Sequence, residues 1–486
     1  MRILEMVVLG FGLLLLIVCT AGNGKYRKIR WAVSAAAGIA SVLHLLVEGY
    51  RWQLYPVYIV TLVLIITTLF RQDGVKKTRR IIRYPLLGFA GLLLALSVFL
   101  AAAMPVFKLP KPDGEEAVGT VSYQWTDQER LESYTPEPKD VRKLMVQMWY
   151  PAKTVNGTPM TVFPEEPALF REYMNVFAES MHLPGFALDY WKYARSNSFE
   201  EAPVQAAERP YPLIIINHGM GTSGLLQTSQ AEHLASHGYI VVAIDHTYST
   251  AATAFPDGTV TNFRSETSSD DFFGSAGAIG ELWTQDVAFV IRQLEAMNSG
   301  QVQSPFAGCM DMNNIGTMGH SFGGATAFEA VYSIESIKAG INMDGTLFTV
   351  DNRSQINKPF MFLQSDNAVQ IKEAYDKDTL PDNVREHLLK EMDIINRVVE
   401  RGGFHLRIKG SAHYNFTDLQ LYSPLIKYTG MTGDIEGHRG ADIVNRYVLD
   451  FFNHYLKGTG GELLSGPRKD YPEVEFQQTT MNKGVF

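Results

Sequence analysis

Four apolar segments occupy the first 105 residues, and they constrain the fold of this region more than any other feature. They run roughly over residues 3–21, 31–47, 54–70 and 85–104. Each is close to the ~20 residues that a helix needs to cross the hydrocarbon core of a bilayer. Lipid offers the backbone no hydrogen-bond partner, so spanning segments of this kind form helices. We therefore predict that residues 1–105 form an anchor of about four transmembrane helices with the lipid bilayer as their partner.

The loops between these segments differ in charge, and this difference predicts an orientation. The loops "KYRKIR" (25–30) and "RQDGVKKTRR" (71–80) are strongly basic, whereas "EGYRWQ" (48–53) is not. Basic loops stay on the cytoplasmic side of a membrane. We expect a multi-pass protein of the cell membrane, with everything after residue 105 on the extracytoplasmic side.

Composition argues against several other classes of protein. The net charge is −8, and no long basic run lies outside the N-terminal quarter, so nucleic acid is not an expected partner. The two cysteines, Cys19 and Cys309, predict no internal disulfide. No Cys/His spacing typical of a zinc site occurs. We therefore expect no metal and no cofactor.

Residues 106–486 alternate between strand-like and helix-like segments. Several strand-like segments have unbroken apolar centres, as strands covered on both faces do. The helix-like segments include 227–238, 280–298, 380–401 and 441–456. This alternation predicts a doubly wound α/β domain with a mostly parallel sheet. Residues 163–198 are an aromatic-rich insertion, which either covers the core or forms a lid over a substrate pocket.

The segment Gly319-His320-Ser321-Phe322-Gly323 has the G-x-S-x-G pattern of a nucleophile elbow. An apolar strand precedes it and a small-residue helix, "GATAFEAVYS", follows it. In this turn the serine adopts a strained backbone conformation, and side chains at the glycine positions would collide with the neighbouring strand and helix. The serine hydroxyl then lies at the N-terminus of a helix, where developing negative charge is favoured.

A serine hydroxyl needs a base, and the base needs an orienting acid. In α/β hydrolases these groups follow the serine in the order acid, histidine. His413 follows the strand "LRIKG" in a loop and is our candidate base, with His438 as a weaker second choice. Asp344 and Asp366 each follow a strand after the elbow. Position alone does not choose between them.

An oxyanion hole needs two backbone N–H groups directed at the carbonyl oxygen. The amide of Phe322, directly after the serine, is the first candidate. The second is the amide of Met220, in the glycine-rich loop "NHGMGTSG" that ends an early strand. His218 lies in the same loop and is assigned a structural role.

Six motifs in this order resemble the plasma-type platelet-activating factor acetylhydrolase family and its bacterial relatives. They are "KLMVQMWYP", "IINHGMGTSG", "LASHGYIVVAIDH", "GHSFGG", "NMDG" and "IKGSAHYNFTD", and the likeness runs from about residue 140 to 456. The resemblance implies an α/β-hydrolase fold with Ser321 as nucleophile and His413 as base. It implies Asp344, not Asp366, as the acid, and Met220 and Phe322 as oxyanion donors. The four N-terminal segments and the insertion 163–198 depart from the mammalian members.

We therefore expect two parts: an anchor, 1–105, and an α/β-hydrolase catalytic domain, 106–486. The expected activity is that of a serine ester hydrolase. It would act on short- to medium-chain acyl esters, including lipid or phospholipid acyl groups, through an acyl-enzyme. The alternative is a catalytically inert membrane sensor or partner-binding protein whose outer domain only resembles a hydrolase.

Overall fold

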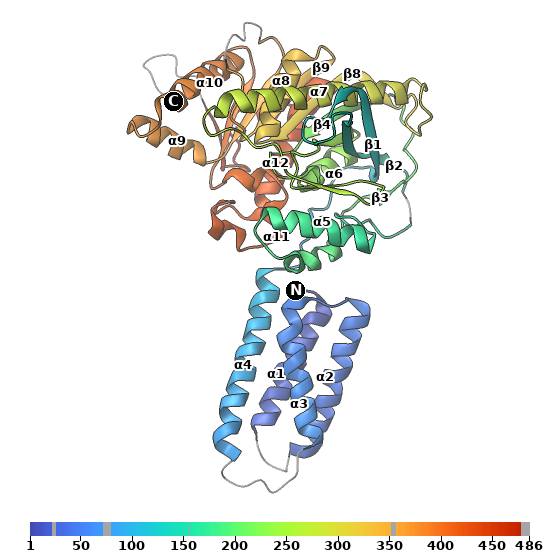
Figure 1. The fold of residues 1–486 in the computed structure, drawn as a ribbon, viewed down its shortest axis with the longest axis vertical. Helices are drawn as coiled ribbons and strands as arrows, with labels where there is room; N and C mark the ends of the chain where they lie inside the picture. Colours follow the sequence, from blue (N-terminus) through green and yellow to red (C-terminus); the bar gives the residue numbers. More distant parts are fainter. Residues whose placement is uncertain (22–25, 71–78, 155, 351–355, 478–486) are drawn as a thin grey trace. The chain divides into compact units, whose positions relative to one another are not determined.

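The computed structural model describes the chain except for residues 22–25, 71–78, 155, 351–355 and 478–486 (Figure 1). The described residues form two compact units. The first contains Met1–Phe107 with the short segments Asp189–Tyr193 and Tyr422–Leu425. The second contains Lys108–Leu188, Ala194–Leu421 and Ile426–Phe486.

The first unit is a bundle of four helices, as predicted. They are α1 (Ile3–Thr20), α2 (Arg27–Val47), α3 (Tyr55–Leu69) and α4 (Arg79–Ala103), with the short η2 (Trp52–Leu54) before α3. All four, with η2 included in the third, are long and apolar enough to cross a membrane. Most of the second basic loop lies outside the described residues, as does Lys25 of the first.

A buried ion pair joins the start of α1 to the α2–α3 connection. The Glu5 and Arg51 side chains are both fully buried, and Oε1 of Glu5 lies 2.8 Å from Nη1 of Arg51. Arg2 Nε lies 2.8 Å from the same oxygen. Pairing of this kind offsets the cost of removing each charge from water. Sequence analysis did not identify this pair, because the two partners lie 46 positions apart.

The second unit is built on a ten-stranded sheet in the order β12-β11-β10-β9-β8-β4-β5-β2-β1-β3. The strands from β11 to β5 run parallel, whereas β2, β1 and β12 join by antiparallel pairing. This confirms the predicted doubly wound, mostly parallel sheet. Their bounds are β1 (Ala117–Leu131), β2 (Val141–Ala152), β3 (Phe199–Glu200), β4 (Tyr211–Asn217), β5 (Ile240–Asp245), β8 (Met310–His320), β9 (Ile337–Met343), β10 (Phe360–Gln364), β11 (Phe404–Ile408) and β12 (Val474–Phe476).

Helices cover both faces of this sheet, which explains the unbroken apolar strands. Ile215 of β4 packs into the core formed with α7 (Phe272–Asn298), α8 (Phe322–Ser333) and α10 (Asp382–Glu400). Its neighbours Ile214 and Ile216 pack into the opposite core, formed with α6 (Thr228–Ser236) and α12 (Gly437–Phe452). All three isoleucines are fully buried. Side chains alternate across a strand, so a strand buried on both faces needs apolar residues at every position.

The sheet has a topological switch point at β4 and β8. From β4 the chain passes through α6 to β5 on one side, while β8 pairs with the other side of β4. At such a switch point the loops after the two strands diverge, and ligands bind at the carboxyl ends of the strands. The residues that follow β4 and β8 are Met220 and its neighbours, and Ser321.

The insertion 163–198 contains α5 (Pro167–Ser180) and η3 (Gly185–Tyr193). Helix α5 contacts the hairpin of β6 (Ala252–Ala254) and β7 (Val260–Asn262). The Tyr173 hydroxyl of α5 donates to Ser223 Oγ at 3.4 Å, in the loop after β4. Remaining elements are η4 (Gly224–Gln227), α9 (Asn367–Asp376), η5 (His413–Phe416), α11 (Leu419–Tyr422), η6 (Ile426–Thr429), η7 (Asn453–Lys457) and η8 (Leu463–Ser465).

Candidate active site

Ser321 occupies a sharp turn between strand and helix. β8 ends at His320 and α8 begins at Phe322. Ser321 between them has φ +55° and ψ −124°. A left-handed φ at a residue with a side chain costs about 1–3 kcal/mol and persists only where the surroundings enforce it. The strained elbow predicted from the sequence is therefore present.

Close backbone approach explains the glycines around this turn. A Cβ on Gly319 would lie 2.2 Å from the carbonyl carbon of Gly323, and a Cβ on Gly323 would lie 2.2 Å from the carbonyl oxygen of Asn217. A Cβ on Gly219, in the loop after β4, would lie 3.3 Å from Cβ of Ser321. The steric role predicted for the elbow glycines is confirmed. Backbone packed this tightly fixes the position of the Ser321 hydroxyl.

His413 reaches the serine from the loop after β11. Its Nε2 lies 2.9 Å from Ser321 Oγ. The ring of His320, the second residue of the elbow motif, donates from Nε2 to the His413 carbonyl oxygen at 2.9 Å. Burial, and next the neighbouring charge of His413, hold the pKa of His320 well below its usual value, so that ring stays neutral. His320 therefore ties the elbow to the His413 loop, a role that sequence analysis missed.

Asp344 lies on the other side of the His413 ring, directly after β9. Its Oδ2 is 2.7 Å from His413 Nδ1. The same carboxylate accepts from the Ser365 amide at Oδ1 (2.7 Å) and from the Ser365 hydroxyl at Oδ2 (3.0 Å). Because a carboxylate can only accept, the Nδ1 position of His413 carries the proton. Nε2 is then free to accept from the Ser321 hydroxyl.

The alternative acid, Asp366, and the alternative base, His438, do not join this hydrogen-bonded group. Asp366 Oδ2 accepts from the Gly410 amide at 2.6 Å, and its Oδ1 lies 3.5 Å from Arg407 Nη1. It therefore supports the turn after β11 and does not contact the imidazole. His438 is exposed near the start of α12. The structure thus brings Ser321, His413 and Asp344 together and leaves Asp366 and His438 outside the group.

Two amides beside the serine have no internal acceptor. The N–H groups of Met220 and Phe322 donate to no other described residue. Phe322 is the first residue of α8, where an N–H has no partner within the helix. The loop of Met220 is held by the Gly221 amide, which donates to the Ser249 carbonyl oxygen at 2.8 Å. These two unpaired amides, at the carboxyl ends of β4 and β8, are available to an oxyanion that forms on the substrate.

A buried polar network lies behind the ends of β4 and β5. His218 Nδ1 donates to the Gly219 carbonyl oxygen at 2.7 Å, and Nε2 accepts from the His246 amide at 3.1 Å. Burial lowers the pKa of His218 to about 3, so the ring is neutral. Both of its nitrogens serve the backbone. His218 therefore has the structural role predicted for it.

The ionic part of this network was not foreseen. His246 Nδ1 lies 2.9 Å from Asp286 Oδ2, and Arg142 Nη2 lies 2.7 Å from the same oxygen. Burial alone would raise the pKa of Asp286, but Arg142 and His246 outweigh it and hold that pKa below its usual value. The only signal in the sequence was a lone aspartate among the apolar residues of the predicted helix 280–298.

Aromatic and apolar side chains surround the site. The Phe322 ring packs against Trp283 and Phe348, with ring centroids 4.8 Å and 4.9 Å apart. A hollow of about 280 Å³ opens beside Asp344 and His413. Its lining includes apolar residues of α10, among them Leu388, Met392 and Ile395. This hollow lies on the acid side of the group, and Ser321 does not line it.

Comparison with known families identifies the chain. The family described as "Platelet-activating factor acetylhydrolase, isoform II" matches residues 101–268 and 288–460, more than half of the sequence. The chain belongs to this family. The match begins near the end of α4, so it leaves out most of the four-helix unit. The resemblance found in the sequence motifs is thereby confirmed.

Individual relatives agree with this membership. A protein of Arthroderma benhamiae named "Probable 1-alkyl-2-acetylglycerophosphocholine esterase" is 26% identical over 402 residues, covering 78% of this chain and 96% of the relative. The "Platelet-activating factor acetylhydrolase" of Canis lupus familiaris is 24% identical over 416 residues, covering 78% and 82%. A solved structure of ferulic acid esterase from Streptomyces cinnamoneus is similar at a TM-score of 0.59 and 25% identity, covering 77% of this chain and 100% of that one.

These similarities establish the class of the protein. Its second unit has the α/β-hydrolase fold, and the family and its neighbours are esterases and acetylhydrolases. The protein is therefore an ester hydrolase.

Proposed function

We propose that this protein is a membrane-anchored serine ester hydrolase that works through an acyl-enzyme on Ser321. The observation that carries the proposal is the continuous hydrogen-bond chain from Ser321 Oγ to His413 (2.9 Å) and from His413 to Asp344 (2.7 Å). Three residues from different loops, 92 and 69 positions apart, meet in the order that nucleophilic catalysis needs.

In the acylation step, Ser321 Oγ attacks the ester carbonyl carbon while its proton moves to His413 Nε2. Asp344 holds the proton on Nδ1 and stabilises the imidazolium that forms. The carbonyl oxygen becomes an oxyanion, which accepts from the amides of Met220 and Phe322 at the positive end of α8. The intermediate then collapses. His413 gives its proton to the leaving alkoxide, and the acyl group stays on Ser321.

In deacylation, water is the nucleophile and Ser321 is the leaving group. A water molecule enters beside His413, which removes a proton as the water oxygen attacks the acyl carbon. The same two amides stabilise the second oxyanion. Collapse returns the proton from His413 to Ser321 Oγ and releases the carboxylic acid. His413 accepts and then returns a proton in each half of the cycle, first from Ser321 to the leaving alkoxide and then from water to Ser321, and the cycle requires no cofactor.

The proposed substrates are short- to medium-chain acyl esters, including acyl groups carried by lipids or phospholipids. Two relatives carry names that refer to acetyl esters of this kind. Phe322, Trp283 and Phe348 pack together and make the surroundings of the elbow apolar. Such surroundings suit an acyl chain more than a charged group.

We place the protein in the cell membrane, held by α1 to α4, with its hydrolase unit on the extracytoplasmic side. The length and apolar composition of the four helices support the anchoring. The side follows from the basic loops 25–30 and 71–80 by the positive-inside rule. A protease added outside intact cells should cleave the hydrolase unit if this orientation is correct and spare it if the unit faces the cytoplasm.

The test is the variant Ser321→Ala in the full-length protein, assayed with p-nitrophenyl acetate. Loss of the nucleophile should lower kcat by about 10⁴-fold or more. Ser333→Ala is the matched control, because Ser333 is an exposed serine at the end of the same helix. Activity that survives Ser321→Ala would refute the proposal. An absence of turnover in both the wild-type protein and the control would favour the inert, hydrolase-like sensor.

A further inference from the structure

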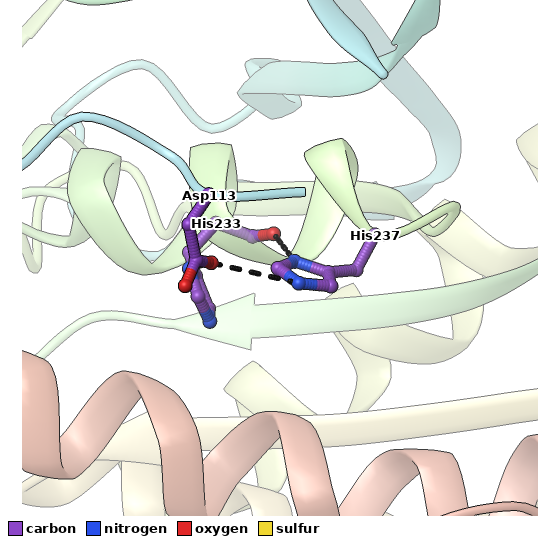
Figure 2. A group of neighbouring side chains, drawn as sticks. All are labelled: Asp113, His233 and His237. Carbon is purple, nitrogen blue, oxygen red and sulfur yellow. Dashed lines mark hydrogen bonds and ion pairs between the residues drawn. The ribbon is translucent and has the colours of Figure 1, made fainter. Parts of the chain in front are cut away.

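A second cluster of ionisable side chains lies in the hydrolase unit and shares no residue with the site described above. It consists of Asp113, His233 and His237 (Figure 2). Asp113 belongs to the segment that leads into β1. His233 lies on α6 and His237 caps the end of that helix. The two histidines are four positions apart, a spacing that places both rings on one side of a helix.

The separations within the cluster fit a tetrahedral metal ion. Asp113 Oδ1 lies 3.3 Å from His233 Nδ1 and 3.5 Å from His237 Nε2. Zn²⁺ binds imidazole nitrogen at about 2.0–2.1 Å and carboxylate oxygen at about 2.0–2.2 Å. At the tetrahedral angle, two ligand atoms on bonds of that length are about 3.3–3.5 Å apart. Both measured separations fall in this range.

The tautomer of His237 leaves a lone pair directed at the carboxylate. Its Nδ1 lies 2.8 Å from the His233 carbonyl oxygen (Figure 2), which can only accept, so Nδ1 carries the proton. In the neutral ring Nε2 is then an acceptor, and it faces another acceptor, Asp113 Oδ1. Two electron-rich atoms at this distance repel each other unless a proton or a cation lies between them.

His233 provides a second, independent indication. Its side chain is 8% exposed, and its Nε2 has no hydrogen-bond partner within the described chain. The other ring nitrogen, Nδ1, faces Asp113 Oδ1 at 3.3 Å. With Nδ1 as the ligand, the ring proton would lie on Nε2.

The carboxylate is already oriented by other contacts. Its second oxygen, Oδ2, lies 3.1 Å from Arg446 Nη2 on α12. The backbone next to Asp113 is fixed as well, since the Gly114 amide donates to Ser236 Oγ (3.2 Å) and the Glu116 amide to the Ser236 carbonyl oxygen (3.1 Å). Asp113 and the His237 ring are thus held in place by contacts that do not require the ion.

We propose that Asp113, His233 and His237 form a Zn²⁺ site that fastens the segment before β1 to helix α6. The ion would be four-coordinate, with a water molecule as its fourth ligand, because Asp113 and His237 are partly exposed. The site would join the residues that follow the four-helix unit to the hydrolase core, and its role would be structural.

The four-helix unit contains a second cluster of carboxylate and imidazole groups, and that cluster is already neutralised. Glu5, His44 and Glu48 also lie within ligand distance of one another. There, however, Arg2 and Arg51 both lie 2.8 Å from Oε1 of Glu5. Two guanidinium groups neutralise that cluster, so it needs no metal ion. Among the described residues, the cluster at Asp113 has one guanidinium, that of Arg446, on the oxygen that does not face the histidines.

The test uses the full-length protein in detergent, stripped with a chelator and titrated with Zn²⁺ and with Co²⁺ as a spectroscopic probe. We expect one equivalent of either ion per chain. The Co²⁺ form should have the intense visible absorption of four-coordinate cobalt, and Zn²⁺ should raise Tm. Asp113→Asn and His237→Gln should each weaken binding by about 100-fold and abolish the rise in Tm. Both positions are partly exposed, so these variants should fold.

Two controls separate the outcomes. His438→Gln removes an exposed histidine from α12 and should bind Zn²⁺ like the wild-type protein. Ser321→Ala should also bind normally, so failure of the proposed catalytic function would leave this result unchanged. The proposal is overturned if the wild-type protein binds no stoichiometric Zn²⁺, or if both ligand variants bind it as tightly as the wild-type protein does.

Discussion

Replacing Asp344 with asparagine isolates the contribution of the carboxylate to turnover. Asp344 has φ +57°, a conformation that asparagine tolerates well, so the backbone should be preserved. The Ser365 amide donates to Oδ1 at 2.7 Å and will retain an oxygen at that position. The new NH₂ group then replaces Oδ2 and faces His413 Nδ1. As a donor, it forces the imidazole proton onto Nε2, where the ring can no longer accept from Ser321.

The expected loss can be worked from the geometry. In the transition state the carboxylate faces an imidazolium at an N···O separation of 2.7 Å. At an effective dielectric constant of ~20, unit charges at that distance attract by about 6 kcal/mol. This corresponds to about 10⁴-fold in kcat, which is also the effect of the same substitution in a serine protease.

The assay is steady-state hydrolysis of p-nitrophenyl acetate, with Tm measured in parallel. Asp344→Asn should lower kcat by about 10⁴-fold and leave Tm nearly unchanged. Asp366→Asn is the matched control, since Asp366 also follows a strand but binds Gly410 and Arg407. It should keep nearly full activity. A larger loss in Asp366→Asn than in Asp344→Asn would refute the assignment of the acid.

Two further predictions concern stability. Burial raises the pKa of Glu391 to about 8, although the Leu347 amide lowers it by donating at 2.7 Å. Between about pH 4.5 and 8 the folded state therefore binds a proton that the unfolded state releases, so stability falls as pH rises. In Glu391→Gln, the decline of Tm over this range should be shallower, and an unchanged slope would contradict the burial argument. Arg142→Met removes the guanidinium that pairs with both buried Asp286 (2.7 Å) and Glu132 (2.9 Å) and leaves Arg130, 2.8 Å from the other oxygen of Asp286, as the remaining guanidinium there. It should cost about 3–5 kcal/mol in urea unfolding; a neutral effect would show that the Arg142 pairs add nothing.

The sequence predicted the fold well where local pattern decides structure. The apolar runs of β4 and β5 and the small-residue helix α8 all lie where periodicity and flanking glycines placed them. Helix α7 is longer than predicted, because it begins at Phe272, not near 280. Asp271 caps it by accepting from the Gly274 amide at 3.0 Å. The glycines at 274 and 277 had hidden that start, because glycine disfavours a helix.

The sequence predicted which positions form the candidate site. It did not predict the hydrogen bonds from neighbouring residues that hold them there, such as those from Ser365. The strand order brings Ser321 and His413 to the same edge of the sheet, so the elbow and the strand before His413 were enough to propose both residues. The choice between Asp344 and Asp366 depends on which of two adjacent strand ends reaches the imidazole, and residue spacing carries no such information. The resemblance to the family had favoured Asp344, and the hydrogen bonds to Ser365 give a physical reason.

Clusters assembled from distant segments were missed for the same reason. Asp113 precedes His233 by 120 positions, and the sequence analysis sought metal sites only in Cys/His spacings. The expectation of no metal therefore rested on short sequence spacings alone, whereas the fold can also bring ligands together from distant segments.

The most direct test of the central claim is covalent labelling with a fluorophosphonate probe, followed by mapping of the modified peptide by mass spectrometry. The account predicts one adduct per chain, on Ser321, that disappears in Ser321→Ala and forms far more slowly in Asp344→Asn. An adduct on a different serine, or undiminished labelling of Ser321→Ala, would contradict it.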